Sequence, residues 1–129
     1  MAVRGVRGAI TAESNTKEEI VSKTRELLDN LVKRNNIDID DISAVIFSAT
    51  DDIDAEFPAV AARKLGWIYT PLFCAREIPV QGSLSGVVRV LMLVNSDKKQ
   101  SEIVQVYMHG AEKLRPDLNH ENHDKYYSS

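Results

Sequence analysis

Arginine side chains interrupt segments of the sequence whose other residues are typical of buried β-strands. Arg89 lies inside an apolar run, and Arg4 and Arg7 lie in the segment 2–11, which is rich in β-branched residues. An arginine stays charged inside a protein, so burying it requires a partner, and its planar fork suits a carboxylate. Two interpretations follow. Arg89 either pairs with Glu77 as a structural ion pair or lies in water at a strand edge, or several arginines converge on a small anion.

Four arginines are spread along the chain so that only folding brings them together: Arg7, Arg63, Arg89 and Arg115. The whole protein has a formal net charge of −3, whereas a nucleic-acid-binding protein needs a basic surface. A locally basic pocket in a slightly acidic protein favours a small anionic ligand over a polyanion. We therefore expect a small-molecule partner and no nucleic acid.

The segment 73–80, FCAREIPV, adds a thiol and a carboxylate to the candidate groups. Cys74 and Glu77 have opposite parity, so a regular strand would point them to opposite faces. Both reach one pocket only if the strand bends or ends between them, which Pro79 permits because it donates no ladder hydrogen bond. A lone cysteine is more often a small buried apolar residue, and Tyr107 is equally compatible with simple packing.

Two groups of residues suggest metal binding, but neither is a persuasive ligand set. The acidic run 51–54, DDID, lies in a predicted loop, where such carboxylates are usually solvated, and His120 and His123 lie three residues apart in the tail. Neither a G-x-G-x-x-G nor a P-loop motif is present, and no histidine lies in a predicted core strand. We therefore predict no metal and no cofactor, and few candidates for acid–base chemistry.

These side chains must be positioned by a small set of helices and strands. Thr16 and Glu19 match a capping box, and the apolar residues that follow recur at helical spacing. The pattern predicts a long helix from about Lys17 to Lys33 or slightly beyond. A short second helix is predicted with Pro58 in its first turn and Gly66 at its end.

Strands are predicted at 2–11, 43–50, 68–76, 87–95 and, more ambiguously, 103–108, and GAEKL at 110–114 suggests a helical turn. The order predicts an α+β fold, close to α/β, in which one long and one short helix cover a mixed sheet of about five strands. Two helices cover only one face of such a sheet. A further copy of the chain is the economical cover for the other face.

The 129 residues fit one domain, with 43% hydrophobic and 27% charged residues, which are ordinary values for a globular protein. We expect the domain to span 1–118 and the polar segment 119–129 to be a flexible tail. No apolar run is long enough for a bilayer, so no membrane partner is expected, and the arginine-containing first residues are unlike a signal peptide. With Cys74 as its single cysteine, the chain forms no internal disulfide, and the cytoplasm is the default compartment.

A set of segments in this order resembles the AroH-type chorismate mutases. They are VRGVRGAIT, FSATDDIDAEFPAVAAR, CAREIPVQGSL, VRVLMLVN and VYMHGAEKLRPDL, and together they run from about Val3 to Leu118. Each piece alone is weak, but the combination is specific. The resemblance implies a homotrimer with a barrel-like core and active sites at subunit interfaces. It also implies the rearrangement of chorismate to prephenate, on the way to phenylalanine and tyrosine.

The resemblance assigns roles residue by residue. The family's catalytic positions fall on Arg7, Glu77 and Arg89, with Arg89 facing the ether oxygen. The substrate-binding positions fall on Phe57, Arg63, Phe73, Cys74, Tyr107, Leu114 and Arg115. Two departures affect the pocket: Val60 occupies a position where some relatives have a lysine, and Phe73 is larger than expected before the cysteine.

Two other functions compete with this one. The first is an imine-hydrolysing deaminase on a similar trimeric architecture, which would also place an arginine in an interface cleft but would leave Glu77 and Tyr107 unexplained. The second is a non-catalytic module that binds small carboxylates without turnover. An assay for chorismate turnover distinguishes both alternatives from a chorismate mutase, because neither alternative would convert chorismate.

Overall fold

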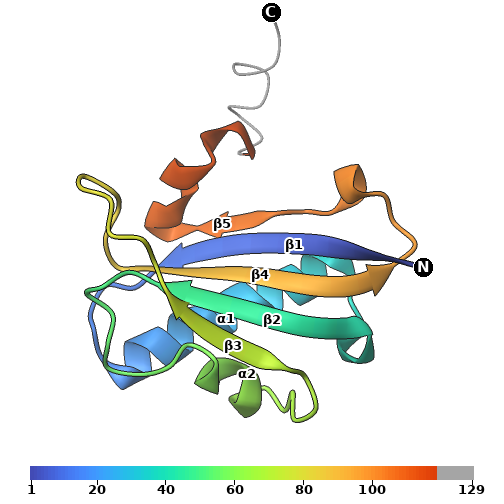
Figure 1. Cartoon of the computed structure of the whole chain (residues 1–129), viewed down its shortest axis with the longest axis horizontal. Coiled ribbons are helices and arrows are strands. Elements are labelled where there is room, and N and C mark those ends of the chain that lie inside the picture. Colours follow the sequence, from blue (N-terminus) through green and yellow to red (C-terminus); the bar gives the residue numbers. More distant parts are fainter. Residues whose placement is uncertain (119–129) are drawn as a thin grey trace, which may run out of the picture.

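A mixed five-stranded sheet is the centre of the computed structural model, which describes residues 1–118 (Figure 1). The strands are β1 (Ala2–Thr11), β2 (Ile42–Ala49), β3 (Leu72–Arg76), β4 (Val87–Ser96) and β5 (Val106–Met108), and the helices are α1 (Lys17–Asn35) and α2 (Val60–Lys64). This confirms the predicted fold class of a mixed sheet with one long and one short helix. The predicted flexible tail, with His120 and His123, lies outside the described residues.

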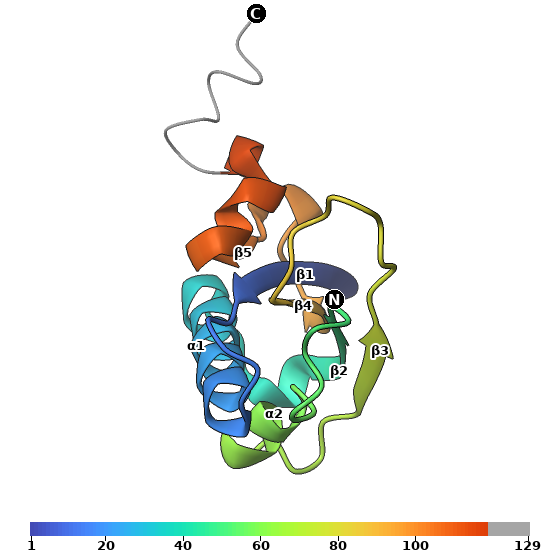
Figure 2. The same cartoon turned by 90° about the vertical axis from the view of Figure 1, so that its left-hand side faces the viewer.

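The strands are ordered β3-β2-β4-β1-β5, so that β4 is central. β4 is antiparallel to both β1 and β2, whereas β3 and β5 run parallel to their neighbours. Both helices lie on the concave side of the curved sheet (Figure 2). The main core forms between this side and α1, and its largest fully buried side chains include Phe47, Ile10, Leu27, Leu31 and Met92.

The predicted caps of α1 are present in modified form. Thr16 Oγ1 accepts a hydrogen bond from the Glu19 N–H at 3.2 Å. The Glu19 carboxylate accepts from the Glu13 N–H at 2.7 Å, rather than from the N–H of Thr16. At the other end Asn36 adopts a left-handed conformation, which ends the helix close to its predicted limit.

Two strands are shorter than the sequence pattern predicts. β3 begins at Leu72 instead of residue 68, because 68–71 form a bend in which Ile68 and Tyr69 are exposed. β5 begins at Val106 instead of residue 103. The Asn35 side chain from α1 bonds both the N–H and the C=O of Val104, at 2.7 and 2.9 Å, and so takes the groups that a longer strand would have used.

The convex side of the sheet carries neither α1 nor α2, and the 3-10 helix His109–Leu114 packs there, against Ala9 and Val87 at one end. The register places alternate residues of each strand there, among them Arg7, Ile46, Phe73, Arg89 and Leu91, and Phe73 is 65% exposed. The expectation that the two helices cover one face only is therefore confirmed. Within 1–118, α1 is the one helix long enough to be considered as a bilayer span, and it is too polar to be one.

Candidate active site

One transverse row of residues crosses the convex face of the sheet and contains the central arginine. Through the strand register, Tyr107 pairs with Ala9, Ala9 with Arg89, Arg89 with Ser48, and Ser48 with Ala75. Paired residues point to the same side of a sheet. Arg89 thus projects from the middle strand, with Tyr107 two strands away on the same face.

Glu77 turns back onto this row from just beyond the end of β3. Its N–H bonds Ala49 C=O at 2.9 Å, which holds the chain after the strand has ended at Arg76. Its carboxylate pairs with Arg89 Nε at 2.9 Å and accepts the Ser48 hydroxyl at 2.5 Å. The Arg89 and Glu77 side chains are 44% and 24% exposed, so the predicted pair forms in a partly open position.

Arg7 lies on the same face of the sheet as Arg89, in the neighbouring strand β1 and offset from Arg89 by two residues along the strand. Arg7 is paired with Leu91, two residues from Arg89 in β4, which makes the two arginines diagonal neighbours about 7 to 8 Å apart. The Arg7 backbone N–H is held by the Gln105 side chain at 2.5 Å. Its guanidinium has no hydrogen-bond or ion-pair partner within residues 1–118. Two cations therefore share one open surface.

Tyr107 and the C-terminal segment border the other end of the row. Tyr107 and Leu114 pack with Leu84 against a small cluster formed by Ala9, Val87 and Ala111. Residues His109–Leu114 form the predicted helical turn, as a 3-10 helix, and Gly110 N–H bonds Thr11 Oγ1 at 2.9 Å. Arg115 makes two hydrogen bonds to Asp117, at 2.9 and 3.0 Å.

Cys74 and Phe57 belong to a different region, on the helix-covered side. Cys74 pairs with the fully buried Phe47 and packs against the main core. It lines a cavity of about 470 Å³ together with Phe57, Pro58 and Arg76. Burial raises the pKa of the Cys74 thiol, with a smaller opposing effect from a backbone hydrogen bond of Ala59, so the thiol is protonated and suited to hydrogen bonding rather than attack.

The remaining two predicted residues lie outside this cavity. Arg63 donates from one guanidinium nitrogen to the carbonyls of Trp67 and Ile68, the latter at 2.9 Å, beyond the end of α2. Phe73 points to the convex face, opposite to Cys74. In one copy, therefore, Arg7, Glu77, Arg89 and Tyr107 gather on the convex side, whereas Phe57 and Cys74 lie on the other.

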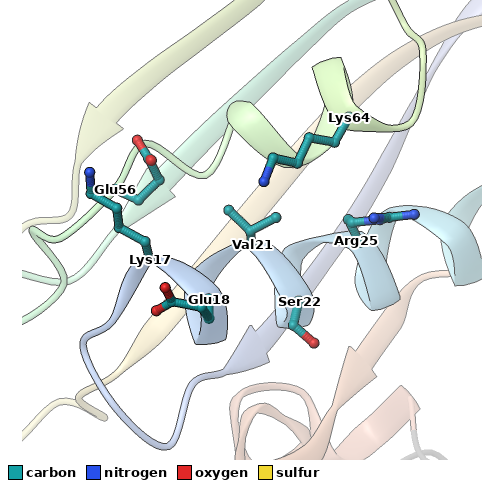
Figure 3. Close-up of a pocket in the computed structure, with 7 residues that line it drawn as sticks. All are labelled: Lys17, Glu18, Val21, Ser22, Arg25, Glu56 and Lys64. Carbon is teal, nitrogen blue, oxygen red and sulfur yellow. The ribbon is translucent and has the colours of Figure 1, made fainter.

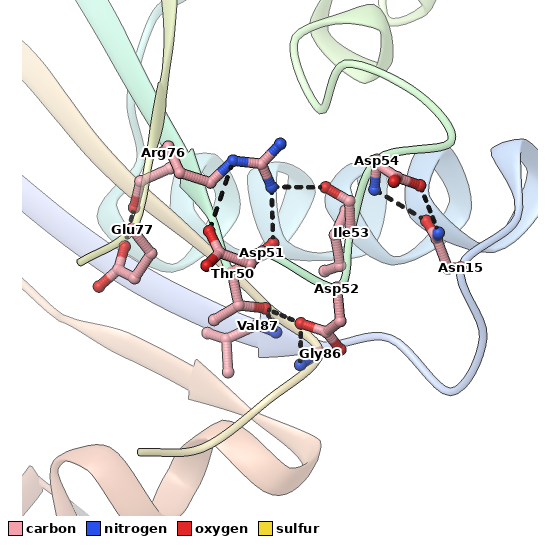
Figure 4. Close-up of polar contacts among 11 residues, drawn as sticks. Asn15, Thr50, Asp51, Asp52, Ile53, Asp54, Arg76, Glu77, Gly86 and Val87 are labelled. Carbon is pink, nitrogen blue, oxygen red and sulfur yellow. Dashed lines mark hydrogen bonds and ion pairs between the residues drawn. The ribbon is translucent and has the colours of Figure 1, made fainter. Parts of the chain in front are cut away.

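Hydrogen bonds made by the acidic loop 51–54, DDID, fix the wall of the cavity that contains Cys74. Asp52 accepts from Thr50 Oγ1 at 2.6 Å and from Gly86 N–H at 3.2 Å, and the Thr50 hydroxyl is the main reason that the pKa of Asp52 is lowered. Asp54 and Asn15 bond each other twice (Figure 4). Within the described part of the chain, no three His, Cys, Asp or Glu side chains cluster as metal ligands.

Arg76 connects this loop to β3. Its guanidinium donates to the Thr50 and Ile53 carbonyls, both at 3.0 Å, and lies 3.7 Å from the Asp51 carboxylate (Figure 4). These contacts fix the loop leading to Phe57 against the strand that carries Cys74.

Ser48 is a candidate site residue that the sequence analysis missed. It orients the Glu77 carboxylate from the neighbouring strand. The available signal was a hydroxyl residue between the apolar Phe47 and Ala49, which predicts a side chain on the face opposite to the core.

Fold and site together define a class of protein: a small α+β domain with two arginines, Arg7 and Arg89, on one face of its mixed sheet. The model of the family "Chorismate mutase type I" matches residues 3–118. The chain belongs to this family.

Individual relatives agree over nearly the whole chain. A chorismate mutase AroH from Thermus thermophilus is 50% identical over 117 residues, which cover 90% of this chain and 96% of that protein. A chorismate mutase AroH from Bacillus subtilis is 43% identical over 120 residues, covering 92% and 94%. The solved chorismate mutase from Clostridium thermocellum superposes with a TM-score of 0.84 at 47% identity, covering 85% of this chain and 98% of that one.

Proposed function

We propose that this chorismate mutase converts chorismate to prephenate in a cleft that two copies of the chain build together. The reaction is a concerted rearrangement in which the ether C–O bond breaks as a C–C bond forms. It needs no nucleophile and no net proton transfer. The protein must hold the side chain of the substrate over the ring and stabilise the charge that develops as the ether bond breaks.

Arg89 is the group proposed to face the ether oxygen. Negative charge builds on this oxygen in the transition state, so a fixed cation there acts mainly on kcat. The observation that carries the proposal is the Arg89–Glu77 contact of 2.9 Å on the sheet face that neither α1 nor α2 covers. This contact orients the guanidinium through Nε and leaves its outer nitrogens available to a ligand.

The other convex-side residues are proposed to bind the rest of the substrate. Glu77 would accept a hydrogen bond from the ring hydroxyl, while Arg7 and Tyr107 would hold a side-chain carboxylate. Leu114 and Arg115 belong to the segment proposed to close over the bound dianion.

A second copy is proposed because the family's site residues do not meet within one chain. Cys74 and Phe57 lie on the opposite side of the sheet from Glu77 and Arg89. A heterologous interface that closes as a ring brings one half-site of each copy against the other half-site of its neighbour. A homotrimer with a barrel-like core satisfies this, and it covers the exposed Phe73 on the convex face. In this assembly the neighbour contributes Phe57 and Cys74 from its helix-covered side, and its Phe73 and Arg63 are proposed to line the site from outside that cavity.

Neither competing function is supported. The family and both relatives are chorismate mutases, which leaves no finding in favour of an imine deaminase or a non-catalytic carboxylate-binding module. The decisive assay mixes the purified protein with chorismate, without metal or cofactor, and follows prephenate by proton NMR. Chorismate that decays no faster than in a protein-free control would overturn the assignment.

The shared site is tested by mixing two inactive variants. Arg89→Ala removes one half-site, and Phe57→Asp places a repelling charge in the other at a side chain that is 68% exposed. If the site spans two copies of a trimer, an equal mixture of the two variants that reassembles at random regains about a quarter of parental activity. In about a quarter of the interfaces, the intact half-site of one variant meets the intact half-site of the other. A site confined to one chain regains none. Sedimentation of the parent protein checks the trimer independently.

We further propose that residues 1–118 form the folding unit and that the enzyme acts in the cytoplasm. The family model matches residues 3–118, and a chain with Cys74 as its one cysteine needs no oxidising compartment. Cell fractionation with an antibody checks the compartment.

A further inference from the structure

Lys17 occupies an unusual position at the edge of the cavity that contains Cys74. It is the first residue of α1 and lines this cavity of about 470 Å³ together with Phe57, Cys74 and Arg76. It also lines a neighbouring groove of about 510 Å³ between α1 and α2. Figure 3 shows the Lys17 side chain extending beside Glu56, over the edge of that groove and away from Arg25.

The ammonium group of Lys17 is uncommitted. It has no hydrogen-bond or ion-pair partner within residues 1–118. The other cation of the cavity, Arg76, is bound to two backbone carbonyls and lies beside Asp51. A free cation at a cavity edge is available to an anionic ligand.

The charges around the cavity explain why such a cation matters. Two carboxylates, of Asp54 and Glu56, line the same cavity and would repel a dianion. Asp54 is bonded by the Asn15 amide, and Glu56 by the N–H of Phe57 at 2.9 Å, but neither contact is an ion pair. Lys17 therefore supplies the one uncommitted positive charge against them in the described part of this cavity.

The position of Lys17 in the helix is unfavourable for stability. Cations in the first turn oppose the helix macrodipole, which favours acidic side chains such as the adjacent Glu18 and Glu19. The helix macrodipole and capping thus give no reason for a lysine here. The nearby helix α2 offers no replacement at residue 60, because Val60 packs against the main core.

We propose that Lys17 is a substrate-positioning residue that binds a carboxylate of chorismate at the outer edge of the two-copy site. This inference rests on the proposed function and specifies it: the half-site with Cys74 provides a carboxylate contact from α1. Lys17 acts on capture of the dianion and does not touch the breaking ether bond, which belongs to Arg89.

The test compares Lys17→Met with Lys64→Met. Lys64 is exposed, lines the same groove as Lys17 (Figure 3) and does not line the cavity with Cys74. Losing a partly solvated charge contact lowers kcat/KM about two- to fivefold in Lys17→Met. The loss lies in KM, with kcat nearly unchanged, and the salt dependence of kcat/KM becomes shallower. Lys17→Arg retains most of the capture, and Lys64→Met behaves as the parent.

The melting temperature separates this role from a structural one. Lys17→Met melts at the parental temperature or higher, since it removes a charge that opposes the helix dipole. A Lys17→Met enzyme with parental KM and salt dependence overturns the inference, and so does an equal loss in Lys64→Met. Arg89→Ala is assayed in parallel. If it is inactive while Lys17→Met matches the parent, only the inference on Lys17 fails; if it retains full activity, the proposed site itself fails.

Discussion

Replacing Arg89 by alanine separates a catalytic arginine from a structural one. The guanidinium projects from the central strand β4 and is paired with Glu77 at 2.9 Å, with the two side chains 44% and 24% exposed. An ion pair that is this accessible to water stabilises a protein by about 1 kcal/mol at most. Glu77 also keeps its hydrogen bond from Ser48 at 2.5 Å, so the substitution leaves no bare carboxylate.

The effect on the reaction is expected to be much larger than the effect on stability. A preorganised donor at a developing oxyanion contributes about 3 to 4 kcal/mol, or roughly 10² to 10³ in kcat, and a charged donor in a dry site contributes more. The Arg89→Ala protein should therefore fold and assemble as the parent does while its kcat falls by at least this factor. The kcat of Arg89→Lys should lie between those of the parent and of Arg89→Ala, because lysine keeps the charge but lacks the planar fork that binds Glu77.

The assay follows loss of chorismate under saturating substrate, with thermal unfolding measured on the same samples. Arg4→Ala is the matched control, because Arg4 is likewise a strand arginine, in β1, but donates from Nε to the Lys98 carbonyl at 2.6 Å. It should change the melting temperature and leave kcat intact. Parental turnover in Arg89→Ala, or a loss explained by unfolding, would refute the role assigned to Arg89.

Three other outcomes follow from the structure. Because burial raises the pKa of the Cys74 thiol, kcat/KM should show no thiol ionisation between about pH 6 and 8, and iodoacetamide should label the folded protein more slowly than the unfolded one. Truncation after Leu114 removes Arg115 and should raise KM more than it lowers kcat. Gly8→Ala should destabilise the fold by about 1 to 3 kcal/mol, since the new Cβ would meet the Val106 carbonyl at 2.6 Å and Leu27 Cδ1 at 2.9 Å.

Further measurements test the physical reason behind each of these outcomes. Because the pKa of the Cys74 thiol is raised in the folded state, its contribution to the free energy of unfolding should be complete below the ordinary thiol pKa and should be lost as the pH rises through the folded value. The substitution Cys74→Ser should abolish that dependence. An unchanged kcat/KM after truncation would remove the C-terminal segment from substrate capture. Gly5→Ala is the control for Gly8, because its nearest contact would be an ordinary 3.7 Å, and equal melting of the two variants would contradict the packing argument.

Local sequence patterns were sufficient to predict the helices and strands that are stabilised by interactions between residues close in the sequence. The capping residue Thr16 and the apolar spacing behind it predicted α1 nearly to its ends, because N-caps and helical periodicity act within a few residues. Strand β1 was predicted at its observed bounds. The two wrong strand starts, at residues 68 and 103, have causes distant in the sequence, such as Asn35 bonding Val104 from another element.

The sequence by itself determined the fold class and the family, and it supplied the polar side chains that are proposed to hold a dianion. Residue types and their order carry this information, which does not depend on contacts between distant segments. Tertiary structure alone decided how those side chains are grouped. The sheet register aligns Tyr107 with Arg89 and brings Glu77 onto Ser48, whereas Cys74 turns to the helix-covered side, next to Lys17. Register and the end of a strand depend on contacts between distant segments, and periodicity within one segment does not encode them.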